Sequence, residues 1–358
     1  DDTGYDVKFF GATSGKYALW DESADSWIIS GTQSTVTAGT SNYIAGVNAG
    51  NSIASGGNYN VAIGDEAGTA LTTGDNNVLI GYAAGDGFDA ESNNVGIGSN
   101  ALGGSSYAAA NNTAIGYNTG SAITSGASNV IVGSNAGDAI TTGGTNTVIG
   151  ASSGTEITTG ANNTFLGATS GDAVTTASQN TAVGSAALSA TTTAGDNTAV
   201  GFAALAANDT GTYNTAVGAS AGAAINGAGN YNTLVGAICG DAITTGDDNT
   251  AVGRGALTTC TTSSFNNAFG SVALEALTTG NYNCAFGYKA AGAMTTGPAN
   301  NAFGHQALDV ATEGQHNNAF GAEALGACTT GSYNCAFGGD ALGAMTTASN
   351  NTAVGKDA

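Results

Sequence analysis

The sequence predicts an all-β fold, a parallel β-roll or β-solenoid of about 19 coils. The first observation behind this prediction is a sequence motif, Asn-x-Ala-apolar-Gly, that recurs 19 times between Asn42 and Gly355. The second is its spacing, which is 17 residues except for three intervals of 18. The third is composition: 58 of the 358 residues are glycine, threonine and β-branched residues are frequent, and no apolar run keeps a helical period. Units this short bury their apolar side only against their neighbours, so they must stack.

We number the positions of each coil from its motif asparagine, so that Asn197 is position 1 and Gly201 is position 5 of one copy. Position 4 is almost always β-branched, leucine or phenylalanine, position 8 is mostly alanine, position 9 is mainly glycine or leucine, and position 12 is often apolar. Threonines pair at positions 13 and 14 in 11 coils. The glycine suits a corner with positive φ or a close approach of the next coil. We expect two short strands and two turns per coil, stacked at about 4.8 Å into a rod of roughly 85 Å.

The first strand of each coil predicts an assembly. Positions 3 and 4 point to opposite faces, yet both are apolar, and a strand that is apolar on both faces is buried on both. One face then fills the coil's own core, and the other meets a second copy of the chain, most naturally in a closed cyclic oligomer. We expect position 4, as at Val200, in the interior. Position 3 is expected in the interface because it carries the large residues Leu79, Ile131, Phe165 and Leu234; the alternative is an alanine column tolerated at the surface.

Residues 1–31 do not follow the repeat, so we separate them from a repeat domain at 32–358. Alternating, aromatic-rich runs at 5–10 and 16–20 predict a β-hairpin, and a third run, Trp27 to Ile29, leads into the solenoid. An open end of a solenoid is an aggregation edge, which favours a role for this segment as a cap or attachment module.

Charge excludes two classes of partner. Five basic residues stand against 26 acidic ones, and the net charge of -21 repels the phosphates of nucleic acids and of anionic membranes. No stretch of 18 apolar residues occurs, and the acidic start at Asp1 and Asp2 is unlike a signal peptide. We expect no nucleic-acid binding and no membrane insertion.

The chain shows no motif for catalysis, a metal or a cofactor. The five cysteines occupy apolar or threonine positions of the repeat, no Cys-x-x-Cys is present, and Cys284 and Cys335 share a column at about 14 Å, too far apart for a disulfide. The only histidines, His305 and His316, lack a neighbouring nucleophile or carboxylate motif. We expect no enzyme; the alternative is a carboxylate pair drawn from Asp241, Asp247, Asp248 and Glu313.

Three repeated columns suggest ladders. The motif asparagines are expected to hydrogen-bond to one another and to the backbone at a corner, a structural ladder exemplified by Asn180, Asn197, Asn214, Asn232 and Asn249. Position 17 carries an aromatic stripe that either caps a corner, which we favour, or stacks on a sugar as a ligand-binding stripe: Tyr213, Tyr231, Phe265, Tyr282 and Tyr333. The threonine pairs suggest ice binding as a further hypothesis. Adjacent threonines point to opposite faces of a strand, however, so each coil offers one outward hydroxyl.

Two groups of proteins resemble these motifs. Asn112 to Gly116, Asn-Thr-Ala-Ile-Gly, is similar to the head repeats of YadA-type trimeric adhesins. Asn197 to Leu205, together with the Thr-Thr-Gly turns, resembles repeats in tail fibres of marine bacterial viruses, and the runs Asp6 to Gly11 and Leu19 to Asp25 resemble segments that precede such repeats in viral structural proteins.

The resemblance implies left-handed parallel β-rolls with three chains side by side. It also implies a structural and adhesive fibre protein of a virion, a homotrimer whose further partner is a host surface glycan or protein. The 17-residue period is longer than that of the adhesin heads, and we expect neither their stalk nor their membrane anchor in this sequence. A cell-surface or extracellular bacterial adhesin is therefore the alternative, and an ice- or polysaccharide-binding solenoid is the third reading.

Overall fold

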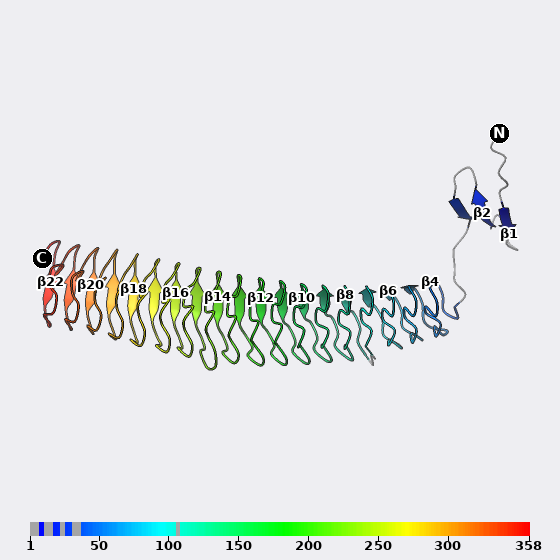
Figure 1. Cartoon of the computed structure of the whole chain (residues 1–358), viewed down its shortest axis with the longest axis horizontal. Coiled ribbons are helices and arrows are strands. Elements are labelled where there is room, and N and C mark those ends of the chain that lie inside the picture. Colours follow the sequence, from blue (N-terminus) through cyan, green and yellow to red (C-terminus); the bar gives the residue numbers. More distant parts are fainter. Residues whose placement is uncertain (1–6, 11–16, 22–25, 31–36, 105–107) are drawn as a thin grey trace, which may run out of the picture.

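The computed structural model describes residues 7–10, 17–21, 26–30, 37–104 and 108–358. Within these ranges every regular element is a β-strand and none is a helix. Figure 1 shows a long rod of stacked coils, with β4 near one end and β22 at the other. The predicted all-β parallel solenoid with a 17-residue period is confirmed.

The rod contains 19 three-residue strands, each paired in parallel and in register with the strand of the next coil. Thr198 pairs with Thr181 and Thr215, and Ala199 with Ala182 and Ala216. The strands are β4 (Tyr43–Ala45), β5 (Val61–Ile63), β6 (Val78–Ile80), β7 (Val95–Ile97), β8 (Thr113–Ile115), β9 (Val130–Val132), β10 (Thr147–Ile149), β11 (Thr164–Leu166), β12 (Thr181–Val183), β13 (Thr198–Val200), β14 (Thr215–Val217), β15 (Thr233–Val235), β16 (Thr250–Val252), β17 (Asn267–Phe269), β18 (Cys284–Phe286), β19 (Asn301–Phe303), β20 (Asn318–Phe320), β21 (Cys335–Phe337) and β22 (Thr352–Val354).

A separate antiparallel sheet precedes the rod, formed by β1 (Val7–Phe10), β2 (Tyr17–Asp21) and β3 (Ser26–Ser30). β1 and β2 pair as the expected hairpin, with Val7 opposite Trp20, and β3 adds a third strand with Trp27 opposite Trp20. Among the described strands, none of these three pairs with a strand of the rod. The role of this sheet as a cap therefore stays a prediction.

Each coil has one strand, at positions 2 to 4, so the expectation of two strands per coil is wrong. The cause lies in the backbone. In the coil of β13, φ is positive at Gly201 (138°), Ala203 (53°), Leu205 (51°) and Tyr213 (58°), which are positions 5, 7, 9 and 17. A strand needs φ near -120°, so left-handed residues at every second position after the glycine curl the chain into turns.

Position 5 shows why its glycine recurs. Gly201 has φ of 138°, and a Cβ built on it would lie 2.5 Å from the carbonyl oxygen of Gly218 in the next coil. Any side chain would collide with that backbone, which cannot move without breaking the stack. The coils can approach this closely only at glycine.

The core lies on the side opposite to the one expected from the sequence. Position 3 is the interior column: Ala199 is 0% exposed, whereas Val200 at position 4 points outward and is half-buried. The large residues that favoured an interface at position 3 are also 0% exposed: Leu79, Ile131, Phe165 and Leu234.

Volume compensation explains why these large residues fit inside. Each of their coils has glycine at position 9, and a Cβ on Gly171 would lie 2.5 Å from the ring of Phe165. Coils with alanine at position 3 often carry leucine at position 9 instead, as Ala199 does with the buried Leu205. The size changes at position 3 therefore adjust the packing density of the coil's own core and are no sign of a partner.

Candidate interaction surfaces

The asparagine column is an internal clamp. The side-chain Nδ2 of Asn197 donates to the carbonyl of Gly211 (2.9 Å), which closes its own coil. Its backbone N–H donates to Oδ1 of Asn180 (3.0 Å), and its own Oδ1 accepts from the N–H of Asn214 (3.0 Å). In Asn249, Nδ2 also donates to Oδ1 of Asn232 (3.1 Å). These carboxamides are buried and hydrogen-bonded to protein, so they stabilise the coil and offer no contact to a ligand.

The outward side chains at positions 2 and 4 of β4–β22 form one continuous surface, which we call the sheet face. Position 4 is apolar in every coil, and no charged residue occupies either position although the chain carries a net charge of -21. The side chains of Ile115, Leu166, Phe286 and Phe337 are between 36% and 44% exposed on it. Position 2 is threonine or asparagine in 12 coils, so the strip is continuously apolar only at position 4. An uncharged strip with an unbroken apolar column along a whole rod is unusual for a surface in contact with water.

Toward the end of the rod that carries β22, the sheet face changes to phenylalanine. The rings at position 4 of β17–β21 stack on one another with centroids 4.5 to 4.9 Å apart and planes within 8° of parallel. We call them the phenylalanine ladder: Phe269, Phe286, Phe303, Phe320 and Phe337. Beside it at position 2, Asn301 donates to Asn318 (2.8 Å), and the free thiols of Cys284 and Cys335 are half-buried.

The aromatic stripe at position 17, the residue before the next motif asparagine (position 18 for Tyr231, in an 18-residue coil), is exposed and forms pairs. Tyr213 stacks on Tyr231 with ring centroids 5.2 Å apart, and Phe265 stacks on Tyr282 at 5.1 Å. The fifth predicted member, Tyr333, stacks on His316 at 5.0 Å. All five predicted members are between 45% and 61% exposed. The rings thus cover one another along the rod axis, and the non-aromatic residues Asp248 and Ala299 separate the pairs.

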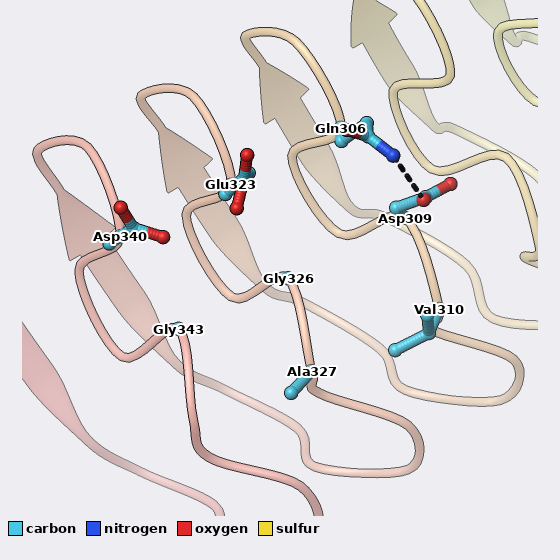
Figure 2. A pocket seen from close by; sticks show the side chains of 8 residues that line it. All are labelled: Gln306, Asp309, Val310, Glu323, Gly326, Ala327, Asp340 and Gly343. Atoms are coloured by element: carbon cyan, nitrogen blue, oxygen red, sulfur yellow. Dashed lines mark hydrogen bonds between the residues drawn. The ribbon is translucent and has the colours of Figure 1, made fainter.

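A shallow groove of about 400 Å³ lies on the loops near the end of the rod at β22. Figure 2 shows that the carboxylates of Asp309, Glu323 and Asp340 come from three successive coils, and that Gln306 donates to Asp309 (3.1 Å). Gly326 and Gly343 also line the groove, and their lack of side chains leaves space between the coils. Nowhere in the described ranges do three potential metal-ligating side chains converge on one point.

The carboxylates named as a catalytic alternative lie at different positions of the coil: Asp241 at position 10, Asp247 at 16, Asp248 at 17 and Glu313 at 14. Asp247 is engaged structurally, since its Oδ1 accepts from the N–H of Asn230 (2.7 Å). Burial raises the pKa of Asp241, and burial likewise raises the pKa of the Cys239 thiol to about 12, which keeps that thiol protonated. The structure does not bring these groups together into one site.

In the part of the chain that the structure describes, no helix has the length and apolar character needed to cross a membrane. No protein-family model matches this sequence, and no curated protein matches it significantly.

Proposed function

We propose that this protein is a structural and adhesive fibre rod, the shaft or head of a viral tail or receptor-binding fibre, and that it works as a homotrimer. The observation that carries the proposal is the sheet face, a charge-free surface as long as the rod with an unbroken apolar column at position 4. The resemblance of the repeats to trimeric adhesin heads and to viral tail fibres supports three chains and the attachment role. A bacterial surface adhesin of the same build is the second reading, because it would use the same face.

The size of the sheet face suits a stable interface. Eighteen coil intervals at about 4.8 Å give roughly 85 Å of length, and a strip about 10 Å wide then covers on the order of 850 Å² per chain. Specific interfaces bury about 800 Å² on each partner. The sheet face of one chain is thus about the size of a single such interface, which a homotrimer divides between the two neighbours of each chain.

Charge favours a second copy of this chain as the occupant. Two molecules of net charge -21 repel each other wherever their acidic surfaces approach. The sheet face carries no charged residue, so copies can meet there at a low electrostatic cost. The phenylalanine ladder at one end favours a parallel arrangement, because rings then meet rings.

The threonine array gives less support to an ice-binding function. The hydroxyl at position 13 donates to the backbone of the next coil, as Thr141 does to the carbonyl of Thr158 (3.0 Å), while Thr142 at position 14 is exposed. A single column of outward hydroxyls remains, and one column offers only a narrow surface on which ice could be ordered.

The test is the mass of the protein in solution, measured by light scattering, for the wild type and for the double variant Val200→Asp/Phe303→Asp. We expect three chains in the wild type and monomers in the variant, since charges on the sheet face would be desolvated in the interface. Thr210→Asp/Thr296→Asp, at exposed position 14, is the matched control and should leave the mass unchanged. A monomeric wild type would refute the assembly.

The attachment role has its own measurement. Excess purified rods added to a host culture should slow adsorption of the virus that carries them, and the monomeric variant should not. Unchanged adsorption in the presence of correctly assembled rods would contradict the adhesive part of the proposal.

A further inference from the structure

The aromatic stripe consists of stacked pairs of rings that single non-aromatic residues separate. Its pairs recur every third coil: Tyr213 with Tyr231, Phe265 with Tyr282, and His316 with Tyr333. Between the second and third pairs, the position-17 residue is Ala299, and between the first and second it is Asp248. The sequence therefore interrupts the stack at single coils.

The backbone continues through the interruption at Ala299. Its N–H donates to the carbonyl of Asn281 (2.9 Å), and the N–H of His316 donates to the carbonyl of Pro298 (3.2 Å), as in the rest of the column. Ala299 also keeps the left-handed φ of 58° that the aromatic residues share. Tyr282 and His316 consequently project from equivalent points two coils apart, with their rings about 10 Å from each other.

That spacing leaves room for one flat ring. A ring placed halfway would lie about 5 Å from each neighbour, the same separation as in the pairs Phe265 with Tyr282 (5.1 Å) and His316 with Tyr333 (5.0 Å). Tyr282 is 61% exposed although one of its faces stacks on Phe265, and this equals the exposure of Tyr59, whose position-17 neighbour in the next coil, Asn76, is not aromatic. The face of Tyr282 toward Ala299 is therefore open.

We propose that the gap over Ala299 binds a neutral pyranose ring of a glycan between Tyr282 and His316. The C–H groups on the two faces of a pyranose are attracted to the negative faces of aromatic rings, and its hydroxyls lie around the equator. Beside the gap, position 16 is Pro298 in the coil of Ala299 and is Asn281 or Gln315 in the coils on either side, and Glu313 at position 14 is exposed. A net charge of -21 disfavours acidic sugars.

The gap at Asp248 has a carboxylate where Ala299 has a methyl group, so the floor of that gap is partly filled and charged. The Ala299 gap is accordingly the primary site. The proposal rests for its biological meaning on the adhesive role proposed above, and it names a chemical class for the ligand. Binding itself uses an edge of the coil distinct from the sheet face.

The experiment is saturation-transfer difference NMR on the full chain with four probes, the methyl β-glycosides of glucose, galactose, mannose and N-acetylglucosamine. We expect saturation of at least one glycoside, strongest at the axial ring protons that face the aromatic planes. The variant Ala299→Tyr fills the gap with a residue that this position of the repeat already tolerates, and should reduce the signal at least fivefold. Gln179→Tyr, a position-17 substitution with no aromatic neighbours in the adjacent coils, should leave it unchanged.

Absence of saturation for all four glycosides in the wild type would overturn the proposal, and so would an undiminished signal in Ala299→Tyr. Loss of the signal in Gln179→Tyr as well would assign it to another part of the surface and would also overturn it. Light scattering on the same samples separates this outcome from a failure of assembly, because the mass reports the sheet face alone.

Discussion

Two regions of the rod share one backbone and differ in what they display. In β5–β16 the sheet face carries valine or threonine at position 2 and isoleucine, leucine or valine at position 4. In β17–β21 it carries asparagine or cysteine beside the phenylalanine ladder. The asparagine clamp and the corner glycine run unchanged through both regions, as at Asn197 and Asn300. The coil is thus a scaffold whose outward chemistry varies without cost to its interior.

The cores of the two regions also differ, in how the same volume is filled. Large residues at position 3 opposite glycine at position 9 recur in the first region, as with Phe165 and Gly171, and do not occur in β17–β21. Every coil from β16 to β21 has alanine at position 3, and most have leucine at position 9, as with Ala302 and Leu308. Compensation between two positions allows both solutions within one stack.

The largest expected effect should be the same in both regions, because it acts on the shared backbone. Gly201→Ala and Gly304→Ala each place a Cβ against the carbonyl of the next coil at a φ of 138° or 145°. We expect a loss of about 4 kcal/mol or more in the free energy of unfolding, measured by chemical denaturation. Ala206→Ser, a small change at a half-buried loop position, is the control. Tolerance of either glycine substitution would contradict the close approach.

The next effect separates the regions by their cores. Phe165→Ala should cost about 3–5 kcal/mol through the cavity it leaves, and adding Gly171→Leu should restore most of that loss by recreating the alanine and leucine pair of the second region. Gly171→Leu alone should destabilise, since the space beside it is occupied by the Phe165 ring. Calorimetry on the three variants tests this. Additive losses in the double variant would show that the two positions do not share one volume.

The asparagine clamp should matter equally along the rod. Asn197→Ala leaves the buried N–H of Asn214 without its acceptor and removes one of the two donors to the carbonyl of Gly211, to which Asn208 also donates; an unsatisfied buried group costs about 1–3 kcal/mol. We expect a loss of about 2–4 kcal/mol for Asn197→Ala and a similar loss for Asn300→Ala, measured by denaturant unfolding. A much smaller effect at Asn300 would mean that the phenylalanine ladder compensates for a broken clamp.

The smallest effect should be confined to the first region. Burial raises the pKa of four position-10 aspartates above the ordinary aspartate value of 3.8, and all four lie in coils of the first region: Asp86, Asp138, Asp172 and Asp241. The folded state then binds more protons than the unfolded state, so stability falls as pH rises through the raised values and is regained as pH falls through them toward 3.8.

Hydrogen exchange, corrected for intrinsic rates, should therefore show β6–β16 becoming better protected in mild acid relative to β17–β21. Asp172→Asn should raise the protection of its own coil at neutral pH by less than about 1 kcal/mol and remove that coil's pH dependence. An equal response in both regions would assign the effect to the overall negative charge instead.

The sequence by itself determined the class of fold, the period and the coil count, because asparagine and glycine recur wherever the backbone requires a clamp or a close approach. It did not determine which face of the strand is inside. Both faces are apolar in Ala199 and Val200, and only packing shows that the small residue meets Leu205 across the core while valine points out.

The tertiary structure also decided two other features. It placed left-handed residues at four positions of the coil, which leaves one strand where the sequence suggested two. It brought the position-17 rings into pairs with a gap over Ala299. Both depend on the backbone conformation of each coil and on how side chains of successive coils meet, and the order of residue types along one coil does not specify either.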